Sequence, residues 1–467
     1  MSIYLEKLNC SAKYALTGLA FLTTGLTHAA VFNVPQDYNH ITDALDAASS
    51  GDEIRVSKDH LETDAYLYTT GRDITIRSYS TDYTTPERGA RWEVPVADGD
   101  VNTALINVSG GKLIIDGFEN LYGGDCNAIY MQSDSEVEVT NSRFSGITRA
   151  DTAGIKTASQ ADNIKIHLDG VTFESNGRGI WMNNVRTSSE LLIQNSHFED
   201  NSSYVVAWQT TYGAHNATIQ DSHFDTRNNR ALRFFAIATP AGQLVQDNIL
   251  IQRCTFHNSP TARYPLSFAG FPHTEANPSD PSSTFTATVK NCLFDLRLGD
   301  DNAETVAINS QDENSGRLSH ITMDHCTVLF GGTLQCGIRF REHQSTLTVR
   351  NSIFEAGGAG NAALRGWRGT TESYNNLLNA SKPWESAAGG QVIDYGGNII
   401  GEEAGFTDIA NNDFTLASDS PAIAAGLNLG ITDDLLGNPR PQPSGSMPDL
   451  GAYERGDNTS VNNWALY

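Results

Sequence analysis

The sequence is poor in positive charge and poorest of all in lysine. Its 467 residues include 8 lysines and 23 arginines against 55 acidic residues, which gives a formal net charge of −24. This excess of negative charge argues against a nucleic acid partner, because proteins that bind nucleic acids neutralise phosphates with basic patches. It argues equally against attachment to a membrane surface through basic residues. With 39% hydrophobic and 18% charged residues, the chain still has enough apolar material to form a core.

Long apolar runs are also missing, apart from one near the start. Lys7 and Lys13 precede an apolar run over 14–26, and the small residues Thr27 and Ala29 follow it. A basic start, a short apolar segment and small residues at −3 and −1 are the layout of a secretory signal peptide. The alternative, a single membrane anchor, needs a longer run. We therefore expect cleavage after Ala29 and a mature protein that is secreted or periplasmic and makes no contact with a membrane.

Cysteines are few, and their number is odd once Cys10 leaves with the signal peptide. The five that remain cannot form a fully paired disulfide framework. Three of them, Cys254, Cys292 and Cys326, stand where other copies of a repeat carry serine. We interpret them as a stacked structural column rather than a metal site, although two thiols on adjacent coils could form one disulfide. Zinc-type Cys/His spacing is absent from the sequence.

A repeat is what the sequence has in abundance. In each copy a polar residue precedes a small one, and an aromatic or aliphatic residue follows shortly after. The copies end at Phe118, Phe144, Phe173, Phe198, Phe224, Phe256, Phe294, Val328, Phe354 and Leu378. A period near 25 residues, with short alternating strands and no helical periodicity, predicts a parallel β-helix. Asn or Asp at the first position tolerates the left-handed backbone of a tight corner, and we expect these side chains to stack as an internal ladder.

The ends of a solenoid need caps. The amphipathic segment 41–48 predicts a short helix over the N-terminal end, and the repeat stops where proline becomes frequent in the C-terminal region. We predict a signal peptide over 1–29, a parallel β-helix over 30–397, a C-terminal cap over 398–455 and a tail over 456–467.

The repeats resemble those of the pectate-lyase-like superfamily. The strings SPAI at 420–423, GNPRP at 437–441 and PDLGAYE at 448–454 are similar to the choice-of-anchor Q region of secreted bacterial members. The resemblance covers residues 31–455 and implies an all-β fold, a single-stranded right-handed parallel β-helix with an N-terminal helical cap and a C-terminal cap. It is less specific for activity, because the superfamily contains lyases, glycosidases, epimerases, esterases and non-catalytic adhesins.

The strand after each repeat turn carries the signal for function. Its second and fourth positions are mostly apolar, so its third should face outward. The third positions are Tyr130, Lys156, Trp181, Ala207, Arg233, Ser267, Ala307, Arg339 and Arg365. Coils about 4.8 Å apart approach the repeat length of a sugar chain, and arginine forks bind carboxylates. We predict a groove for an anionic polysaccharide, lined by Tyr130, Arg178, Trp181, Gln209, Arg339, Arg341, His343, Arg365 and Trp367.

Cleavage of a uronate polysaccharide such as alginate or pectate by β-elimination needs a base, a group that neutralises the carboxylate, and a proton donor. The resemblance implies Lys or Arg as base and calcium or Arg as neutraliser. We therefore assign Lys156 as the base and Arg233 as the neutraliser, with Arg178 as a substitute. Tyr212 and His215, placed on a loop, form an alternative base and acid pair. His343 is a further acid–base candidate, and Ca²⁺ could be held by Asp134, Glu136 and Asp151.

Two other functions stay open at this point. A β-helix glycoside hydrolase needs a pair of carboxylates, for which Asp312, Glu313 and Glu342 are candidates, and an epimerase is related to the lyase by mechanism. A non-catalytic carbohydrate-binding surface protein is the third possibility. We expect a monomer, in which the excursions over 258–286 and 300–317 wall the groove.

Overall fold

The computed structural model describes residues 29–64, 67–94, 104–227, 230–236, 245–270, 284–299, 305–310, 318–332, 334–341, 345–357 and 360–456. The predicted signal peptide lies outside this part of the chain, except for Ala29. Within it, no helix has both the length and the apolar composition needed to cross a membrane.

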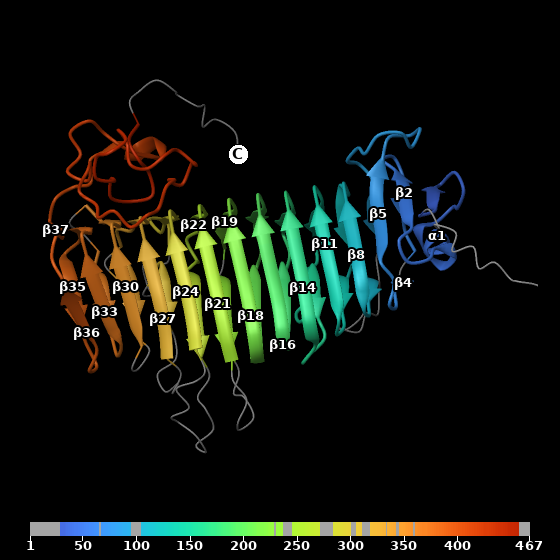
Figure 1. Ribbon diagram of the computed structural model, residues 1–467, viewed down its shortest axis with the longest axis horizontal. Helices are drawn as coiled ribbons and strands as arrows, with labels where there is room; N and C mark the ends of the chain where they lie inside the picture. The colour runs from blue at the N-terminus through green and yellow to red at the C-terminus, as the bar shows by residue number, and fades with distance from the viewer. Residues whose placement is uncertain are drawn as a thin grey trace, which may run out of the picture.

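The chain winds into an elongated, right-handed parallel β-helix, as the repeat predicts (Figure 1). Each full coil contributes one strand to each of three parallel sheets, which we call sheets I, II and III. Along the chain, a strand of sheet I is followed by one of sheet III and then by one of sheet II. Sheet I, which faces the viewer in Figure 1, contains β1 (Val31–Val34), β2 (Glu53–Ser57), β5 (Ile74–Tyr79), β8 (Gly111–Asp116), β11 (Ser135–Thr140), β14 (Asp162–Asp169), β21 (Val245–Gln252), β24 (Thr284–Lys290), β27 (Leu318–Asp324), β30 (Thr346–Arg350), β33 (Thr370–Tyr374) and β36 (Gln391–Asp394).

Sheet II carries the strands predicted to bear the site. It contains β4 (Leu67–Tyr68), β7 (Ala104–Val108), β10 (Asn127–Met131), β13 (Ile155–Thr157), β20 (Arg230–Ala236), β23 (Tyr264–Gly270), β26 (Ile308–Ser310), β29 (Ile338–Phe340), β32 (Ala362–Gly366) and β35 (Lys382–Ser386). Two long strands, β16 (Ile180–Gln194) and β18 (Val206–Gln220), run through both sheets, because their first residues pair in sheet II and their last residues pair in sheet I.

Sheet III is built from short strands. It contains β3 (Leu61–Glu62), β6 (Arg91–Glu93), β9 (Asn120–Tyr122), β12 (Arg143–Ser145), β15 (Thr172–Glu174), β17 (His197–Glu199), β19 (His223–Thr226), β22 (Thr255–Asn258), β25 (Leu293–Asp295), β28 (Thr327–Leu329), β31 (Ile353–Glu355), β34 (Leu377–Asn379) and β37 (Ile399–Ile400). From β12 onward, the aromatic or aliphatic residue that ends each repeat lies inside such a strand and points into the core. Rings of Phe144, Phe173, Phe198, Phe224, Phe256 and Phe294 stack with centroids 4.7–5.0 Å apart.

In most repeats the opening polar residue lies at a corner with positive φ, for example 50° at Asn195 and 52° at Asn291, and in the copies at 116 and 169 the glycine that follows takes this position. This confirms the predicted left-handed corner. The predicted internal ladder is wrong in its position, because the side chain points outward: Asn141 and Asn195 are exposed, and the Nδ2 of Asn195 donates to Asp169 Oδ1 at 2.7 Å. The inward ladder is formed by the next residue of the repeat.

In most copies that next residue is serine or cysteine, and both bind backbone in the same way. Ser196 Oγ accepts the N–H of Val171 on the previous coil at 3.2 Å and donates to Gln194 O at 2.7 Å. Cys254 Sγ donates to Gln252 O at 3.3 Å in the equivalent position. None of the five described cysteines forms a disulfide, and all five are buried. Burial raises the pKa of Cys254 well above that of an exposed thiol. The column is structural, as predicted.

The N-terminal end is covered by helix α1 (Ile41–Ala47), which buries Ile41, Ala44 and Leu45 in the core. Its first N–H group, from Ile41, donates to Glu62 Oε2 at 2.6 Å. The carboxylate of Glu62 therefore takes the capping role that no side chain at His40 performs.

The C-terminal region folds back onto sheet III, beside the orange and yellow strands of Figure 1. It contains a short hairpin, β38 (Phe406–Asp408) and β39 (Asp413–Leu416), joined by the 3₁₀ helix η1 (Ile409–Asn411). Outward positions that are polar in β12–β22 become apolar beneath it. Leu293 and Leu329 pack there against Phe414. The cap is therefore a second layer on one side of the solenoid, as well as its end.

The cap is joined to five successive corners of the solenoid by polar contacts. Arg253 pairs with Asp433 at 2.7 Å, and Asn291 donates to Asp433 O at 2.9 Å. His325 contacts Asp449 O at 3.1 Å. The remaining two corners donate through their amides to cap carbonyls: Asn351 to Leu427 O and Asn375 to Ala425 O.

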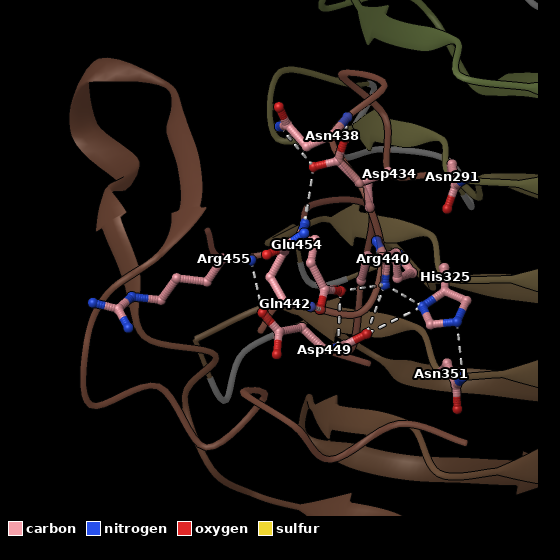
Figure 2. Close-up of polar contacts among 12 residues, drawn as sticks. Asn291, His325, Asn351, Asp434, Asn438, Arg440, Gln442, Asp449, Glu454 and Arg455 are labelled. Carbon is pink, nitrogen blue, oxygen red and sulfur yellow. Dashed lines mark hydrogen bonds and ion pairs between the residues drawn. The ribbon is translucent and has the colours of Figure 1, made fainter. Parts of the chain in front are cut away.

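The GNPRP and PDLGAYE strings meet in a buried network (Figure 2). Arg440, from the first string, donates to the carbonyls of Asp449 and Gly451 at 2.8 and 3.1 Å, and contacts His325 on the solenoid. Its Nη1 lies 3.3 Å from Glu454, from the second string. Both side chains are fully buried. These strings therefore fasten the cap and are not a surface site.

Candidate functional site

The outward positions of sheet II form one continuous row, which we call the basic column. Strand register aligns Tyr130, Lys156, Trp181, Ala207, Arg233, Ser267, Asn309, Arg339, Arg365 and Glu385. The prediction that Ala307 belongs to this row is wrong. Strand β26 begins at Ile308, which pairs with Leu266, so Asn309 is the neighbour of Ser267 and Arg339.

A second row of large side chains borders the column on its N-terminal side. Strand register aligns Ile180, Val206, Leu232 and Leu266. The second row consists of the residues two positions earlier in each strand: Arg178, Tyr204, Arg230 and Tyr264. Of these four residues, only Arg178 was predicted from the sequence. The signal for the others was present, because arginine and tyrosine alternate at a position that each repeat aligns. These side chains lean over the basic column, so Lys156 is only 3% exposed and Arg339 only 5%.

Two cations lie close to the ring of Trp181. The Nζ of Lys156 lies 4.6 Å and the guanidinium of Arg178 4.2 Å from the centre of its ring. Its indole N–H donates to Gln209 Oε1 at 3.1 Å. Lys156 Nζ also donates to Asp151 O at 2.8 Å. These contacts favour a charged, fixed ammonium group, which suits the positioning of Trp181 better than the abstraction of a proton.

Arg233 forms the centre of the second group. Its guanidinium lies 4.2 Å from the ring centre of Phe235 and 5.0 Å from that of Tyr204. The hydroxyl oxygen of Tyr204 accepts N–H donors from Arg233 at 3.2 Å and from Arg230 at 3.1 Å. Within the described part of the chain, no carboxylate contacts Arg233.

The pKa of Arg233 is lowered because burial disfavours its charged form, and the positive charges of Arg230 and Arg178 act in the same direction, while Tyr204 opposes the shift. An anion placed beside Arg233 would relieve this clustering of positive charge.

Arg339 continues the pattern farther along. It donates to Asn309 Oδ1 at 3.0 Å and to the hydroxyl oxygen of Tyr264 at 3.3 Å. Burial lowers its pKa, and Arg341 and Arg365 add to that effect. At the next coil, Trp367 has the guanidinium of Arg365 4.4 Å and that of Arg341 5.6 Å from its ring centre.

Arg365 differs from Arg233 in having a carboxylate partner. Its Nε lies 2.8 Å from Glu385 Oε2 on β35, which ends the row. The column is therefore most strongly positive in its middle, between Arg178 and Arg341.

A shallow depression of about 350 Å³ lies beside the column at its N-terminal part. Tyr130, Gln132, Gln160 and Arg186 contribute to its wall. The polar and aromatic lining could hold one sugar unit.

The side chains of the alternative pair Tyr212 and His215 do not lie on one surface, although His215 Nε2 lies 3.0 Å from the backbone carbonyl oxygen of Tyr212. Both residues lie within the continuous strand β18 rather than on a loop, because β18 passes without a break from sheet II to sheet I. His215 points inward, is fully buried, and packs edge-on against Trp208. Tyr212 is half-buried, with Arg186 5.9 Å from its ring centre. An acid and base pair needs both groups on one surface, so this prediction is wrong.

The three carboxylates suggested for calcium do not converge either. Asp134 follows β10 and Asp151 precedes β13, so they lie at opposite ends of two paired strands. Glu136 lies on sheet I and pairs with Lys112 at 2.8 Å, a contact that lowers its pKa. Asp134 accepts from Asn163 at 2.7 Å, and Asp151 lies 3.6 Å from Arg178. His343, Asp312, Glu313 and Glu342 lie outside the described residues, as do most of the two excursions.

Lys156 and Arg233 are three coils apart, which corresponds to about 14 Å along the stack. They cannot act on the same bond of one sugar. Arg233 has nearer partners in Tyr204 and Arg230, which the sequence did not single out.

Comparison with known proteins agrees with the fold. Residues 127–272 match the family described as right handed beta helix region. No curated protein matches the chain. Among solved structures the chain is similar to a GH136 lacto-N-biosidase from Eubacterium ramulus, with 11% identity over 76% of this chain and 62% of that one and a TM-score of 0.25. The chain thus spans about three fifths of the length of that structure.

Proposed function

We propose that this chain is a secreted or periplasmic polysaccharide lyase that binds an anionic, uronate-containing polysaccharide along the basic column of sheet II. The observation that carries the proposal is Arg233, a half-buried guanidinium with aromatic and phenolic neighbours and no described carboxylate partner. A uronate carboxylate fits such a guanidinium, because a carboxylate accepts two parallel N–H hydrogen bonds from arginine.

The rest of the column fits a sugar chain. Coils about 4.8 Å apart present a cation or an aromatic ring at most steps. Trp181 and Trp367, each with two cations near its ring, would contact sugar rings at the two ends of the positive region. A positive strip on a chain with a net charge of −24 would select an anionic ligand for this surface.

The proposed chemistry centres on Tyr204. Arg233 binds the carboxylate and withdraws charge from it, which acidifies the proton on C5. Acting as the phenolate, Tyr204 takes this proton on its oxygen, the C–H electrons form the C4–C5 double bond, and the C4–O bond breaks with its electron pair leaving on the glycosidic oxygen. Tyr204 then returns the proton to the leaving oxygen. Arg230 and Arg233, which both donate to the Tyr204 oxygen, stabilise the phenolate from which this step starts.

The roles predicted from the sequence shift accordingly. Arg233 keeps its role as neutraliser. Lys156 becomes a positioning residue for Trp181, and the base is Tyr204. Calcium is not needed in this scheme, so activity should survive a chelator.

The test is incubation with a panel of uronate polysaccharides, alginate and pectate included, with and without a chelator. The product of β-elimination contains a conjugated double bond and absorbs in the ultraviolet. We expect absorbance to rise with at least one substrate, and Arg233→Ala to abolish the rise. Arg88→Ala is the matched control. Arg88 is an exposed arginine outside the column, and its Nε lies 2.9 Å from Glu119 Oε2.

Other outcomes distinguish the alternatives. New reducing ends without absorbance would overturn the lyase in favour of a hydrolase. If the chain bound a polysaccharide, Arg233→Ala weakened that binding and no substrate gave a product, the protein would be a non-catalytic carbohydrate-binding protein. Equal activity of Arg233→Ala and Arg88→Ala would remove the assigned site.

A further inference from the structure

A cluster of histidines lies on the outer face of sheet III, away from the basic column. His197 on β17 and His223 on β19 are register partners on adjacent coils. Their rings stack with centroids 4.7 Å apart and an angle of 9° between the planes. Asp225, two residues after His223, points to the same face, and its Oδ1 lies 3.1 Å from His223 Nε2. All three side chains are about one third exposed, so an ion in solution can reach them.

The repeat explains how these side chains come together. In a strand of sheet III the central Phe points inward, so the residues on each side of it point outward. Two consecutive copies, Asn-Ser-His-Phe at 195–198 and Asp-Ser-His-Phe at 221–224, place histidine at the same outward position. The neighbouring coils have Thr172 and Thr255 there. The pair is thus one coil apart in space and 26 residues apart in sequence.

The surroundings orient the ligand atoms. Thr255 Oγ1 lies 2.6 Å from His223 Nδ1 and fixes the ring. When Nδ1–H donates to this oxygen, the Nε2 lone pair faces the Asp225 carboxylate, and a cation between them would be coordinated by both. A hydrogen bond from the far ring nitrogen is the usual support of a metal-binding histidine. Further ligand atoms are close: Glu199 Oε2 lies 3.4 Å from His197 Nε2, and the His257 ring lies 4.9 Å from that of His223 with an angle of 49° between the planes.

We propose that His197, His223 and Asp225 form a binding site for a divalent transition-metal ion such as Zn²⁺. One ligand atom from each residue lies within 4.8 Å of the other two. Zinc is bound at about 2.0–2.1 Å by histidine nitrogen and carboxylate oxygen, so small rotations of these exposed side chains close the site. Imidazole and carboxylate ligands suit Zn²⁺, Ni²⁺ or Cu²⁺ better than Ca²⁺.

The cluster has a defined limit on one side. Asp295, the next carboxylate along the row after His257, is held by two hydrogen bonds from Arg297 at 2.8 and 2.7 Å. The guanidinium of Arg297 excludes a cation there. The metal site is therefore centred on the first two coils of the cluster, and it is independent of the proposed lyase activity.

The experiment is calorimetric titration of the full chain, without a polyhistidine tag, with ZnCl₂. We expect one saturable Zn²⁺ site per chain, its loss in the His197→Ala/His223→Ala double variant, and weaker binding in Asp225→Asn. Titration with Co²⁺ should give visible absorption bands of a nitrogen- and oxygen-ligated ion in the parent chain, and none in the double variant.

The matched control is His167→Ala. His167 is a partly exposed histidine on sheet I that pairs with Glu190 at 3.4 Å, but its register neighbours are Glu138 and Leu192 rather than a second histidine. Zn²⁺ binding should be unchanged in this variant. Far-ultraviolet circular dichroism of each variant verifies that the solenoid is folded. Absence of saturable binding in the folded parent chain, or equal binding in the double variant and the parent, would overturn the proposal.

Discussion

Arg440 and Glu454 face each other across 3.3 Å in a fully buried ion pair that joins two motifs of the C-terminal cap. Removing one partner of such a pair leaves the other charge buried without compensation. Arg440→Met also leaves the carbonyls of Asp449 and Gly451 without their donor. We expect a loss of about 3–5 kcal/mol in the free energy of unfolding, measured by urea denaturation.

The Arg440 prediction has two internal controls. Arg88→Met removes an arginine from an exposed pair and should change stability by less than about 1 kcal/mol. The double variant Arg440→Met/Glu454→Gln should recover part of the loss, since no unpaired carboxylate remains. If Arg440→Met proved as stable as Arg88→Met, the network would not hold the cap.

The same carboxyl group predicts a pH dependence. Burial raises the pKa of Glu454 to about 7, from 4.5 for an exposed glutamate, although Arg440 opposes the shift. A raised pKa in the folded state means that stability is fully present below pH 4.5 and is lost as the pH rises through 7. Between pH 4.5 and 7.5 the free energy of unfolding of the parent chain should fall by about 3 kcal/mol relative to that of Glu454→Gln, in which residue 454 cannot ionise. Parallel stability curves of the two proteins between pH 4.5 and 7.5 would contradict the assignment.

The phenylalanine stack supplies a stability prediction at the solenoid core. Phe198 lies between Phe173 and Phe224, with ring centroids 5.0 and 4.8 Å away. Phe198→Ala would leave a cavity between two rings and should cost about 3–5 kcal/mol by urea denaturation. Phe198→Leu keeps most of the volume and should cost clearly less. Equal losses in the two variants would mean that the cavity is not the cause.

Tyr204→Phe isolates the proposed chemistry from binding. The substitution removes one hydroxyl and keeps the ring beside Arg233. Turnover should fall by about 10²–10⁴-fold while KM changes little. Tyr395→Phe, on an exposed tyrosine outside the column, is the control and should retain full turnover. Undiminished turnover in Tyr204→Phe would show that another group moves the proton.

The repeat was sufficient to predict the fold, because its spacing measures the length of a coil and its aromatic residue identifies the strand that faces the core. Phe144, Phe198 and Phe224 recur with a polar corner before them, and both features appear where expected. The structural role of the cysteine column could be predicted for the same reason, since Cys254 occupies a serine position.

The site was predicted less well, because it depends on features that vary from coil to coil. The repeat period does not show that β26 begins at Ile308, so the period places Ala307 in the basic column where the structure has Asn309. The burial of Lys156 depends on long side chains from other coils, such as Trp181 and Arg178. The continuity of β18 through a corner turns His215 into the core, where a loop would have left it exposed.

Contacts between distant parts of the chain were beyond local patterns altogether. Arg440 meets His325 across 115 residues, and Asn351 meets Leu427 across 76. The C-terminal strings indicated that a cap exists, but not which corners of the solenoid it touches. His197 and His223 were visible as repeat members, and only their stacking made them a cluster.

The five corner contacts of the cap divide the solenoid into two parts with different freedom to open. Where a coil contacts only its two neighbouring coils, it can detach by breaking the contacts with those two coils alone. From Arg253 to Asn375 a detaching coil must also break its bond to the cap, so these coils open together or not at all. Amide hydrogen exchange should therefore be uniformly slow over this part and graded over the coils before it. The cap thus makes a cooperative block out of repeats that would otherwise unravel one by one.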